Sequence, residues 1–576
     1  MSGTRAGSFT FVLHSHLPWV LHHGRWPHGV DWLNEATAET YLPLWRLLHE
    51  RAARKRPLGV TLGLSPVLCE QLAHPDFHAE FAAYLDQKLG AAVDDRAYFG
   101  RTGETALAAI AARWERFYRA SLEEFMGPRG PNLVARFRRL EEEGAIEIIT
   151  CGATHGYFPL LGTDDAIEGQ LRTARMAHRR HFGHDPRGVW LPECGYRPAG
   201  RWTSPLDPQA GPVERRGVEE LVADQGLRYF FVDTHLLSGG TPLGVYADRF
   251  EALRHVVHED GAGAPATERL PYRPYRVGRS AEVCCYARDA ETALQVWSGE
   301  HGYPGDPAYL DFHKKRFPGG HRYWAVTHPR ADLAHKQVYR AEVAEARAPE
   351  HAAHFVDLLG RVLGDAAGRQ SAPPILCAMF DTELFGHWWF EGPRFIAAVL
   401  DGLEAAGIEP TTAGAHLEHH APREVVDLPE GSWGDGGRHQ VWLNDDTRWT
   451  WGPIHAAEAR FGRLARDAAQ AGTEPLLERL LTQAGRELLL LEASDWQFLI
   501  TTFAARDYAE LRLAEHAESF ERIAALAARR FAGGLLAEAD EAFLRECERR
   551  DGLFSDFDWR VYAGHPAAPA GAPTRG

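Results

Sequence analysis

Short apolar runs recur along the chain, each ended by glycine, proline or polar residues, and this recurrence limits the possible folds more than any other feature. Stretches long enough for helices, such as Ala166–His181 and Pro212–Gln225, separate many of these runs. Strands that alternate with helices are typical of a parallel sheet that is closed, or nearly closed, into a barrel. The sequence therefore predicts an α/β fold with seven strands. The seven runs are Phe9–Leu13, Gly59–Leu64, Ala145–Ile149, Gly188–Leu191, Tyr229–Val232, Leu294–Trp297 and Ile375–Phe380.

Two further regions have a helical pattern. Between the second and third runs, apolar residues from Leu107 to Phe125 repeat at spacings of three and four, and the chain from about residue 452 is again rich in helix-forming residues. The last residues, rich in alanine, proline and glycine, cannot bury a core. We therefore expect a barrel over residues 1–75 and 145–415, a helical insertion over 76–144, a helical C-terminal domain over 416–560 and a disordered tail over 561–576.

The composition excludes several classes of protein. The 576 residues contain 63 Lys and Arg against 79 Asp and Glu, a net charge of −16, so no basic face is available for nucleic acid. No apolar run approaches the ~18 residues of a membrane span, and Phe9–Leu13 is too short for a signal peptide. Seven cysteines without a C-x-x-C pair argue against disulfides and structural zinc. We expect a cytoplasmic protein without a nucleic-acid or membrane partner.

Polar residues follow several of the predicted strands directly. The carboxyl ends of barrel strands lie at one face of the fold, where such proteins place their active sites. The sequence therefore predicts an active site at this face. The residues are His14 and His16 after the first run, His155 after the third, Glu193 after the fourth, Asp233 after the fifth and Asp381 after the seventh.

Two of these carboxylates stand among aromatic residues. Glu193 lies in the segment WLPECGY, and Asp381 lies in the segment FDTELFGHWW. A carboxyl pair at an aromatic-lined barrel mouth suits glycoside chemistry, because one group attacks the anomeric carbon while the other protonates the leaving oxygen. A single Asp or Glu is more often a surface charge. The context of Glu193 and Asp381 favours a catalytic role for both.

The histidines allow a second interpretation. His14, His16 and His155 could bind zinc together with Asp233 or Asp381, and a metal-activated water would then make the protein a hydrolase or deacetylase. The two histidines of an H-x-H segment in a strand point to one face, however, which equally serves hydrogen bonding to sugar hydroxyls. The residues alone leave both interpretations open.

Five segments, in this order, resemble the ordered regions of glycoside hydrolase family 57. The resemblance extends from about residue 9 to about residue 520 and is greatest to the α-1,4-glucan branching members of that family. It implies an incomplete (β/α)7 barrel with a helical insertion and an all-helical C-terminal domain, and it implies neither a metal nor another cofactor. The segments are HSHLP at 14–18, GATHGYFP at 152–159, WLPECGY at 190–196, FDTELFGHWW at 380–389 and SDW at 494–496.

The resemblance also implies a chemistry. Glu193 would be the nucleophile and Asp381 the general acid/base of a retaining mechanism, in which an α-1,4-glucan is cleaved and the segment passes to a 6-hydroxyl, forming an α-1,6 branch. The implied partner is an α-glucan, and a monomer is expected. The further residues implied to contact substrate are His14, His16, Trp26, His155, Tyr246, Arg288, Trp297, Gly305, Trp388, Trp433, Trp442, Asp495 and Trp496.

Other functions compete with branching. A 4-α-glucanotransferase or α-amylase of the same family would form no α-1,6 links. A metal-dependent deacetylase or mannosidase on a related barrel would lose activity on chelation. A non-catalytic protein that binds glucan through its tryptophan clusters would show no turnover at all.

Overall fold

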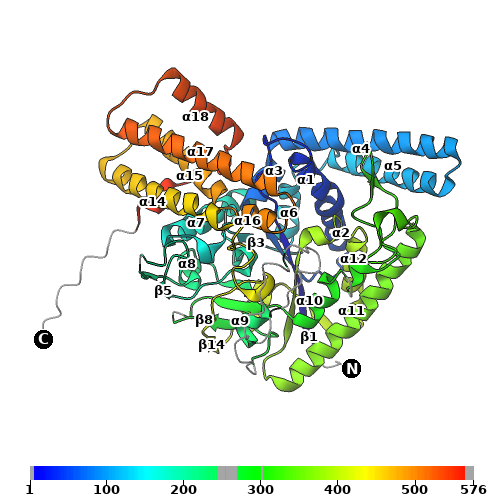
Figure 1. Cartoon of the computed structure of the whole chain (residues 1–576). Coiled ribbons are helices and arrows are strands. Elements are labelled where there is room, and N and C mark those ends of the chain that lie inside the picture. Colours follow the sequence, from blue (N-terminus) through cyan, green and yellow to red (C-terminus); the bar gives the residue numbers. More distant parts are fainter. Residues whose placement is uncertain are drawn as a thin grey trace.

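A curled sheet with seven parallel strands forms the centre of the molecule (Figure 1). The computed structural model describes residues 6–209, 211–239, 242, 253, 269–279, 281–299 and 302–564. The parallel strands lie in the order β12-β1-β2-β3-β4-β7-β9, followed by β8, antiparallel to β9, and by β14. Within the described part of the chain β12 and β14, at the two ends, do not pair, so the predicted incomplete barrel of seven parallel strands is confirmed.

The strands are short, as is usual for parallel sheets covered by helices. The seven central strands are β1 Gly7–Ser15, β2 Val60–Leu64, β3 Glu147–Cys151, β4 Gly188–Trp190, β7 Tyr229–Val232, β9 Cys284–Ala287 and β12 Ile375–Asp381. The others are β5 Gly200–Trp202, β6 Val213–Arg215, β8 Tyr275–Val277, β10 Lys315–Arg316, β11 His321–Arg322, β13 Ile408–Pro410 and β14 Val425–Val426.

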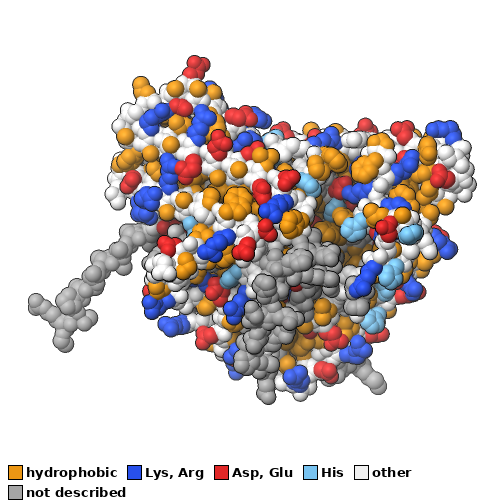
Figure 2. Space-filling view, in the orientation of Figure 1, with side chains coloured by type: hydrophobic (Ala, Val, Ile, Leu, Met, Phe, Trp, Pro, Cys, Tyr) orange, Lys and Arg blue, Asp and Glu red, His pale blue; other side chains and the backbone are white. Residues whose placement is uncertain are grey.

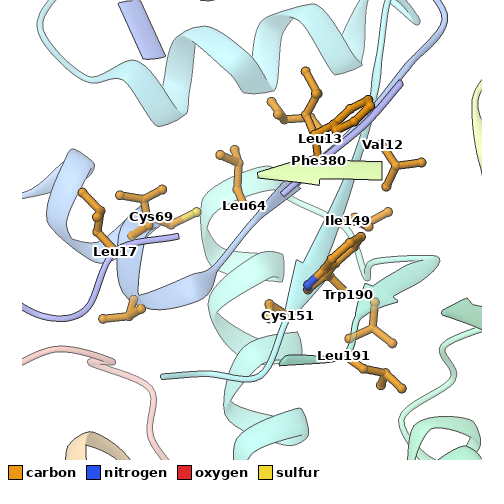
Figure 3. Packing of buried hydrophobic residues seen from close by; sticks show 14 of the residues in the cluster. Val12, Leu13, Leu17, Leu64, Cys69, Ile149, Cys151, Trp190, Leu191 and Phe380 are labelled. Carbon is orange, nitrogen blue, oxygen red and sulfur yellow. The ribbon is translucent and has the colours of Figure 1, made fainter. Parts of the chain in front are cut away.

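The core lies on both faces of this sheet. All nine residues of β1 are buried, because the strand is paired on both sides and covered above and below. Figure 3 shows side chains of β1, β3, β4 and β12 packed together, with Val12, Ile149, Trp190 and Phe380 among them. Burial of this kind contributes about 1.5–3 kcal/mol for each large side chain. The strand ends that carry the polar residues are therefore held by a rigid core.

Six of the seven predicted runs coincide with strands, and one is wrong. Leu294–Trp297 belongs to helix α10, Ala290–Trp297, which starts where the Asp289 carboxylate accepts from the backbone N–H of Thr292 at 2.7 Å. Val296 and Trp297 of this run are buried with Ala293 on the inner face of the helix, whereas Leu294 is exposed. The missed strand is β9, Cys284–Ala287. The predicted helix Pro212–Gln225 likewise starts with β6 and becomes helical only at Val218.

Helices cover the sheet, and one helical hairpin projects from it. Helices α4 and α5 form the hairpin, which extends away from the body in Figure 1. Helix α6 packs against α2, α3 and α7, so the final part of the expected insertion, 76–144, lies on the barrel. The helices are α1 Val30–Ala36, α2 Leu42–Ala53, α3 Pro66–Ala73, α4 Pro75–Thr102, α5 Thr105–Phe125, α6 Leu133–Glu142, α7 Asp164–Phe182, α8 Val218–Asp224, α9 Thr234–Ser238, α10 Ala290–Trp297, α11 Ala341–Arg369, α12 Gly392–Gly402 and α13 Ala413–His419.

The C-terminal region is a layered group of helices (Figure 1). Its helices are α14 Arg448–Ala471, α15 Pro475–Leu491, α16 Asp495–Thr501, α17 Arg506–Phe531 and α18 Glu538–Arg550, with a final 3-10 turn, η9 Trp559–Ala563. Strand β14 lies within 416–560 and pairs with the central sheet, so that stretch is not helical throughout.

Ordered structure continues beyond residue 560, where the disordered tail was expected to begin. Val561 and Tyr562, at the start of the expected tail, are buried in η9, where Tyr562 packs edge-on against Phe461 of α14. These two residues are therefore not disordered; residues 565–576 of that expectation lie outside the described residues. No helix in the described ranges is long and apolar enough to cross a membrane. Acidic and basic side chains are interspersed on the face shown in Figure 2.

Candidate active site

A cavity of about 200 Å³ lies at the carboxyl ends of the central strands. It brings together nine of the residues selected from the sequence, and helix α16 of the C-terminal region closes one side. The nine are His14, His16, His155, Glu193, Trp297, Asp381, Trp388, Trp433 and Asp495. The other lining residues are Leu17, Trp32, Glu383, Leu384, Phe498, Leu499 and Ala504.

Glu193 follows β4 in a tight turn that presents its carboxylate to the cavity. Glu193 and Cys194 both have left-handed backbone conformations, with φ of 59° and 50°, which are costly for residues other than glycine and are often retained at functional sites. The indole Nε1 of Trp433 donates to Glu193 Oε2 at 2.8 Å, and Ser494 Oγ donates to Oε1 at 3.4 Å. These contacts fix both oxygens of the carboxylate.

Burial dominates the electrostatics of Glu193. Desolvation raises the pKa of its carboxyl to about 7, against the hydrogen bonds from Trp433 and Ser494, which lower it; the negative charge of Asp495 raises it further. The group therefore changes charge near neutral pH. Above pH 7 it is an anion with the basicity of a good nucleophile.

Asp381 is the last residue of β12 and lies opposite His14 of β1 in the sheet register. Glu383, two residues later, is buried, accepts from the backbone N–H of His16 at 3.2 Å and is also hydrogen-bonded by the Tyr41 hydroxyl. Burial raises the pKa of Glu383 to about 7. The sequence analysis did not select Glu383, although it stands in the same segment as Asp381.

The three histidines form a connected network. His14 Nε2 lies 2.9 Å from His155 Nε2, and His155 Nδ1 lies 2.8 Å from Ser494 Oγ. Burial lowers the pKa of both His14 and His155 well below 6.5, so both rings are neutral at pH 7 and one ring donates to the other. His16 Nε2 lies 3.0 Å from Asp495 Oδ2, which joins the barrel to α16.

The metal interpretation requires a different ligand set from the one expected. Asp233 is buried, accepts from Arg288 Nε at 2.9 Å and does not line the cavity, so the set with Asp233 is not assembled. His16, His155 and Asp495 instead bring three possible ligand atoms within 4.8 Å of one another. The ring nitrogens of this set hydrogen-bond Ser65, Ser494, His14 and Asp495.

Aromatic rings form the walls. Trp190 stacks on His14 at 4.9 Å between ring centroids and meets Trp433 edge-on, also at 4.9 Å. Trp297 packs edge-on against Trp433, and Trp388 stacks on Phe312 with 3° between the ring planes. Flat apolar faces beside carboxylates and histidines suit a sugar, whose rings have apolar faces and polar edges.

Four of the selected residues do not line the cavity. Arg288 lies over the Trp433 ring at 5.5 Å, and Trp442 stacks on Tyr157 at 4.3 Å. Trp496 is buried and donates from Nε1 to the backbone carbonyl of Leu490. The fourth is Gly305, the end of a 3-10 turn at Tyr303–Gly305. Motif membership alone could not separate these residues from those that line the cavity.

Two more selected residues have other positions. Trp26 lies on the surface, 72% exposed and outside the cavity. Tyr246 lies outside the described residues. Trp32 lines the cavity from α1 but was not selected; its sequence signal was the tryptophan cluster at 19, 26 and 32. Phe498, Leu499 and Ala504 also line the cavity, and no feature of the sequence marked them as lining residues.

Comparison with known proteins assigns the chain to a family. A family model of glycosyl hydrolase family 57 matches residues 10–429. The chain belongs to glycosyl hydrolase family 57. A second model, described as the C-terminal part of 1,4-alpha-glucan branching enzyme, matches residues 453–562.

Relatives named as branching enzymes match at least 95% of the chain. A 1,4-alpha-glucan branching enzyme of Thermococcus kodakarensis is 39% identical over 549 residues, covering 95% of this chain and 77% of the relative. A probable 1,4-alpha-glucan branching enzyme of Mycobacterium tuberculosis is 32% identical, covering 96% and 98%. The family 57 branching enzyme structure from Pyrococcus horikoshii superposes with a TM-score of 0.87 at 38% identity, covering 99% and 98%. The α-amylase AmyC of Thermotoga maritima superposes with a TM-score of 0.78 at 26% identity, covering 98% and 100%.

Proposed function

We propose that this protein is a 1,4-α-glucan branching enzyme that works by a retaining double displacement. The observation that carries the proposal is that Glu193 and Asp381 line one aromatic-walled cavity, in a chain whose relatives at 39% and 32% identity are named as branching enzymes. Most enzymes that cleave glycosidic bonds use a pair of carboxyl groups of this kind.

In the first step Glu193 attacks the anomeric carbon of an α-1,4-linked glucose unit. The C1–O4 bond breaks, Asp381 donates its proton to the departing 4-oxygen, and a glycosyl ester forms on Glu193. Trp433 Nε1 and Ser494 Oγ hold the attacking carboxylate in place, so less ordering is required at the moment of reaction.

In the second step the 6-hydroxyl of another glucan segment replaces water as the attacking group. Asp381, now ionised, takes the hydroxyl proton; the new C1–O6 bond forms and Glu193 leaves as a carboxylate. The configuration at C1 is inverted twice and is therefore retained. His14 and His155, neutral and linked through their Nε2 atoms, line the cavity, and His155 Nδ1 lies 2.8 Å from the Ser494 hydroxyl that contacts Glu193.

The proposal is tested by incubating the purified protein with linear amylose while iodine colour and reducing ends are followed together. A fall in iodine colour with few new reducing ends, followed by release of short chains by a debranching enzyme, is expected. Reducing ends that rise in step with the loss of colour, with nothing released by debranching, would overturn the proposal and favour the α-amylase alternative that the likeness to AmyC supports. A change in the distribution of chain lengths, with neither a rise in reducing ends nor a release of short chains by debranching, would indicate a 4-α-glucanotransferase.

The partner, compartment and assembly belong to the same proposal. A neutral α-glucan is compatible with a net charge of −16, which would repel polyanions. We expect a monomer in the cytoplasm, and size-exclusion chromatography with light scattering tests the monomer directly.

A further inference from the structure

A second hollow lies between the loop before α1, the outer face of α4 and the hairpin formed by β10 and β11. Its lining includes the two most exposed aromatic side chains of the described residues, Trp26 at 72% and Phe317 at 65%. Large apolar side chains exposed beside a hollow mark a binding surface more often than isolated ones do. Between them lie the polar groups of Arg25, Gln87 and Lys88.

The hairpin presents Phe317 on a fixed support. Lys315 and Arg316 pair with Arg322 and His321, which leaves Phe317 in the connecting turn. Gly319 packs so closely on α4 that a Cβ there would lie 2.8 Å from the Cβ of Ala91, and Lys88 Nζ donates to the Gly319 carbonyl at 3.0 Å. The turn that carries the exposed ring is therefore held on α4, which lowers the entropy cost of binding there.

Two parts of the fold, helix α1 and the segment that contains Phe312, lie next to both the hollow and the catalytic cavity. Helix α1 places Trp32 in the catalytic cavity and the neighbouring Asp31 in the hollow. On the other side, Trp388 of the catalytic cavity stacks on Phe312, and the Nζ of Lys315 lies 5.7 Å from the centroid of the Phe312 ring. A chain leaving the catalytic cavity across Phe312 would meet the hollow next.

The charges of the hollow largely neutralise one another. Arg25 Nε pairs with Asp31 at 3.1 Å, and Lys315 Nζ pairs with Glu35 at 3.0 Å. Arg25 also donates to Gln87 at 2.8 Å. Aromatic platforms with paired charges and hydrogen-bonding groups suit an uncharged polyhydroxyl chain better than an anion or an apolar peptide.

We infer that this hollow, defined by Trp26, Gln87, Lys88 and Phe317, binds a linear α-1,4-glucan segment that continues from the catalytic cavity. The inference rests on the proposed branching function and deepens it. It assigns the recognition of long chains to α4 and to the turn that contains Phe317. Phe317 is a residue that determines chain-length specificity and takes no part in the chemistry.

The test compares long amylose with short malto-oligosaccharides. Phe317→Ala is expected to lower the ratio of kcat/KM for long chains to kcat/KM for short chains about 3- to 10-fold, the loss of one aromatic contact. Phe317→Trp should preserve the ratio. The matched control is Phe531→Ala, at the end of α17, where another phenylalanine is 41% exposed; its ratio should equal that of the unaltered protein.

A binding measurement separates this inference from the proposed function. In a Glu193→Gln background, titration calorimetry should show weaker binding of long amylose when Phe317→Ala is added, and no change with Phe531→Ala. Unchanged affinity and an unchanged kinetic ratio for Phe317→Ala would overturn the inference. Failure of the unaltered protein to form α-1,6 links would overturn the proposed function instead, and the binding comparison would still decide whether the hollow takes glucan.

Discussion

The indole Nε1 of Trp433 donates a 2.8 Å hydrogen bond to Oε2 of Glu193, although the two residues are 240 positions apart. The backbone N–H of Trp433 also donates to the Glu193 carbonyl at 3.0 Å. The same tryptophan thus fixes the main chain and the side chain of the expected nucleophile. The indole hydrogen bond opposes the effect of burial on the pKa of Glu193.

Loss of the indole donor should move the pH profile. Burial places the pKa of Glu193 at about 7, so kcat/KM of the unaltered protein should fall as the pH drops through 7, when the nucleophile becomes protonated. Trp433→Phe removes a hydrogen bond to the charged form and should shift this acid limb to higher pH. Trp442→Phe, which changes a tryptophan stacked on Tyr157, is the control. An acid limb that stays in place in Trp433→Phe would contradict the prediction.

The buried carboxyl of Glu193 should also cost stability at alkaline pH. The pKa of Glu193 in the folded protein lies above the ordinary value of 4.5. The stability that the protonated carboxyl contributes is therefore fully present below about pH 4.5 and is lost as the pH rises through 7. Glu193→Gln should therefore raise the free energy of unfolding at pH 8, by at most about 3 kcal/mol, and change it little at pH 4.5. Thermal unfolding at the two pH values measures this difference, and equal shifts at both would refute it.

Tyr41 should contribute to the stability of the fold and to the pKa of Glu383 in the cavity. Its hydroxyl hydrogen-bonds Glu383, and both groups are buried. Tyr41→Phe leaves a buried acceptor with one donor fewer and should lower the free energy of unfolding by about 1–3 kcal/mol. It should also raise the pKa of Glu383, which the tyrosine hydrogen bond lowers. Tyr98→Phe, which removes a hydroxyl from an exposed tyrosine, should leave the melting temperature unchanged.

The loop after β1 should be held on the C-terminal region by the buried carboxylate of Asp551. His23 Nε2 lies 2.6 Å from Asp551 Oδ1, and Arg550 Nε lies 2.8 Å from Oδ2. Asp551→Asn removes the negative charge that Arg550 faces and weakens the contact with His23, and it should cost about 3 kcal/mol of stability because Arg550 remains partly buried. Calorimetry should show a lower melting temperature than for Asp467→Asn, a matched change at an exposed site on α14.

Chelation provides a test of the competing chemistry. The double displacement uses only carboxyl groups, so prolonged incubation with a chelator should leave the branching rate unchanged. A rate that falls and returns on addition of zinc would instead favour a metal held by His16, His155 and Asp495, whose ligand atoms lie within 4.8 Å of one another.

The strands could be predicted because buried parallel strands are short continuous apolar runs. Five of the six residues expected at their ends meet in one cavity, and Asp233 does not line it. The prediction failed at Leu294–Trp297, where three apolar residues within four positions belong to helix α10, two of them buried and Leu294 exposed. The strand next to it, β9, has only the four residues CCYA and gives no run of its own.

The sequence did not show which selected residues are covered. Trp496 shares the segment SDW with the lining residue Asp495, and Trp442 lies nine positions after the lining residue Trp433. Only the packing of Trp442 on Tyr157 and the hydrogen bond from Trp496 to Leu490 show that both are covered. Trp32 and Phe498 contribute apolar surface from helices, and no spacing in the sequence distinguishes such residues from ordinary core.

The pair formed by His16 and Asp495 spans 479 positions of the chain. During synthesis the first strand leaves the ribosome long before α16 exists, so the nascent barrel has an unfinished pocket with polar groups exposed to water. The cavity closes only when residues 494–504 emerge and dock. A chain released early would therefore carry both carboxyl groups of the expected pair and yet have no closed site.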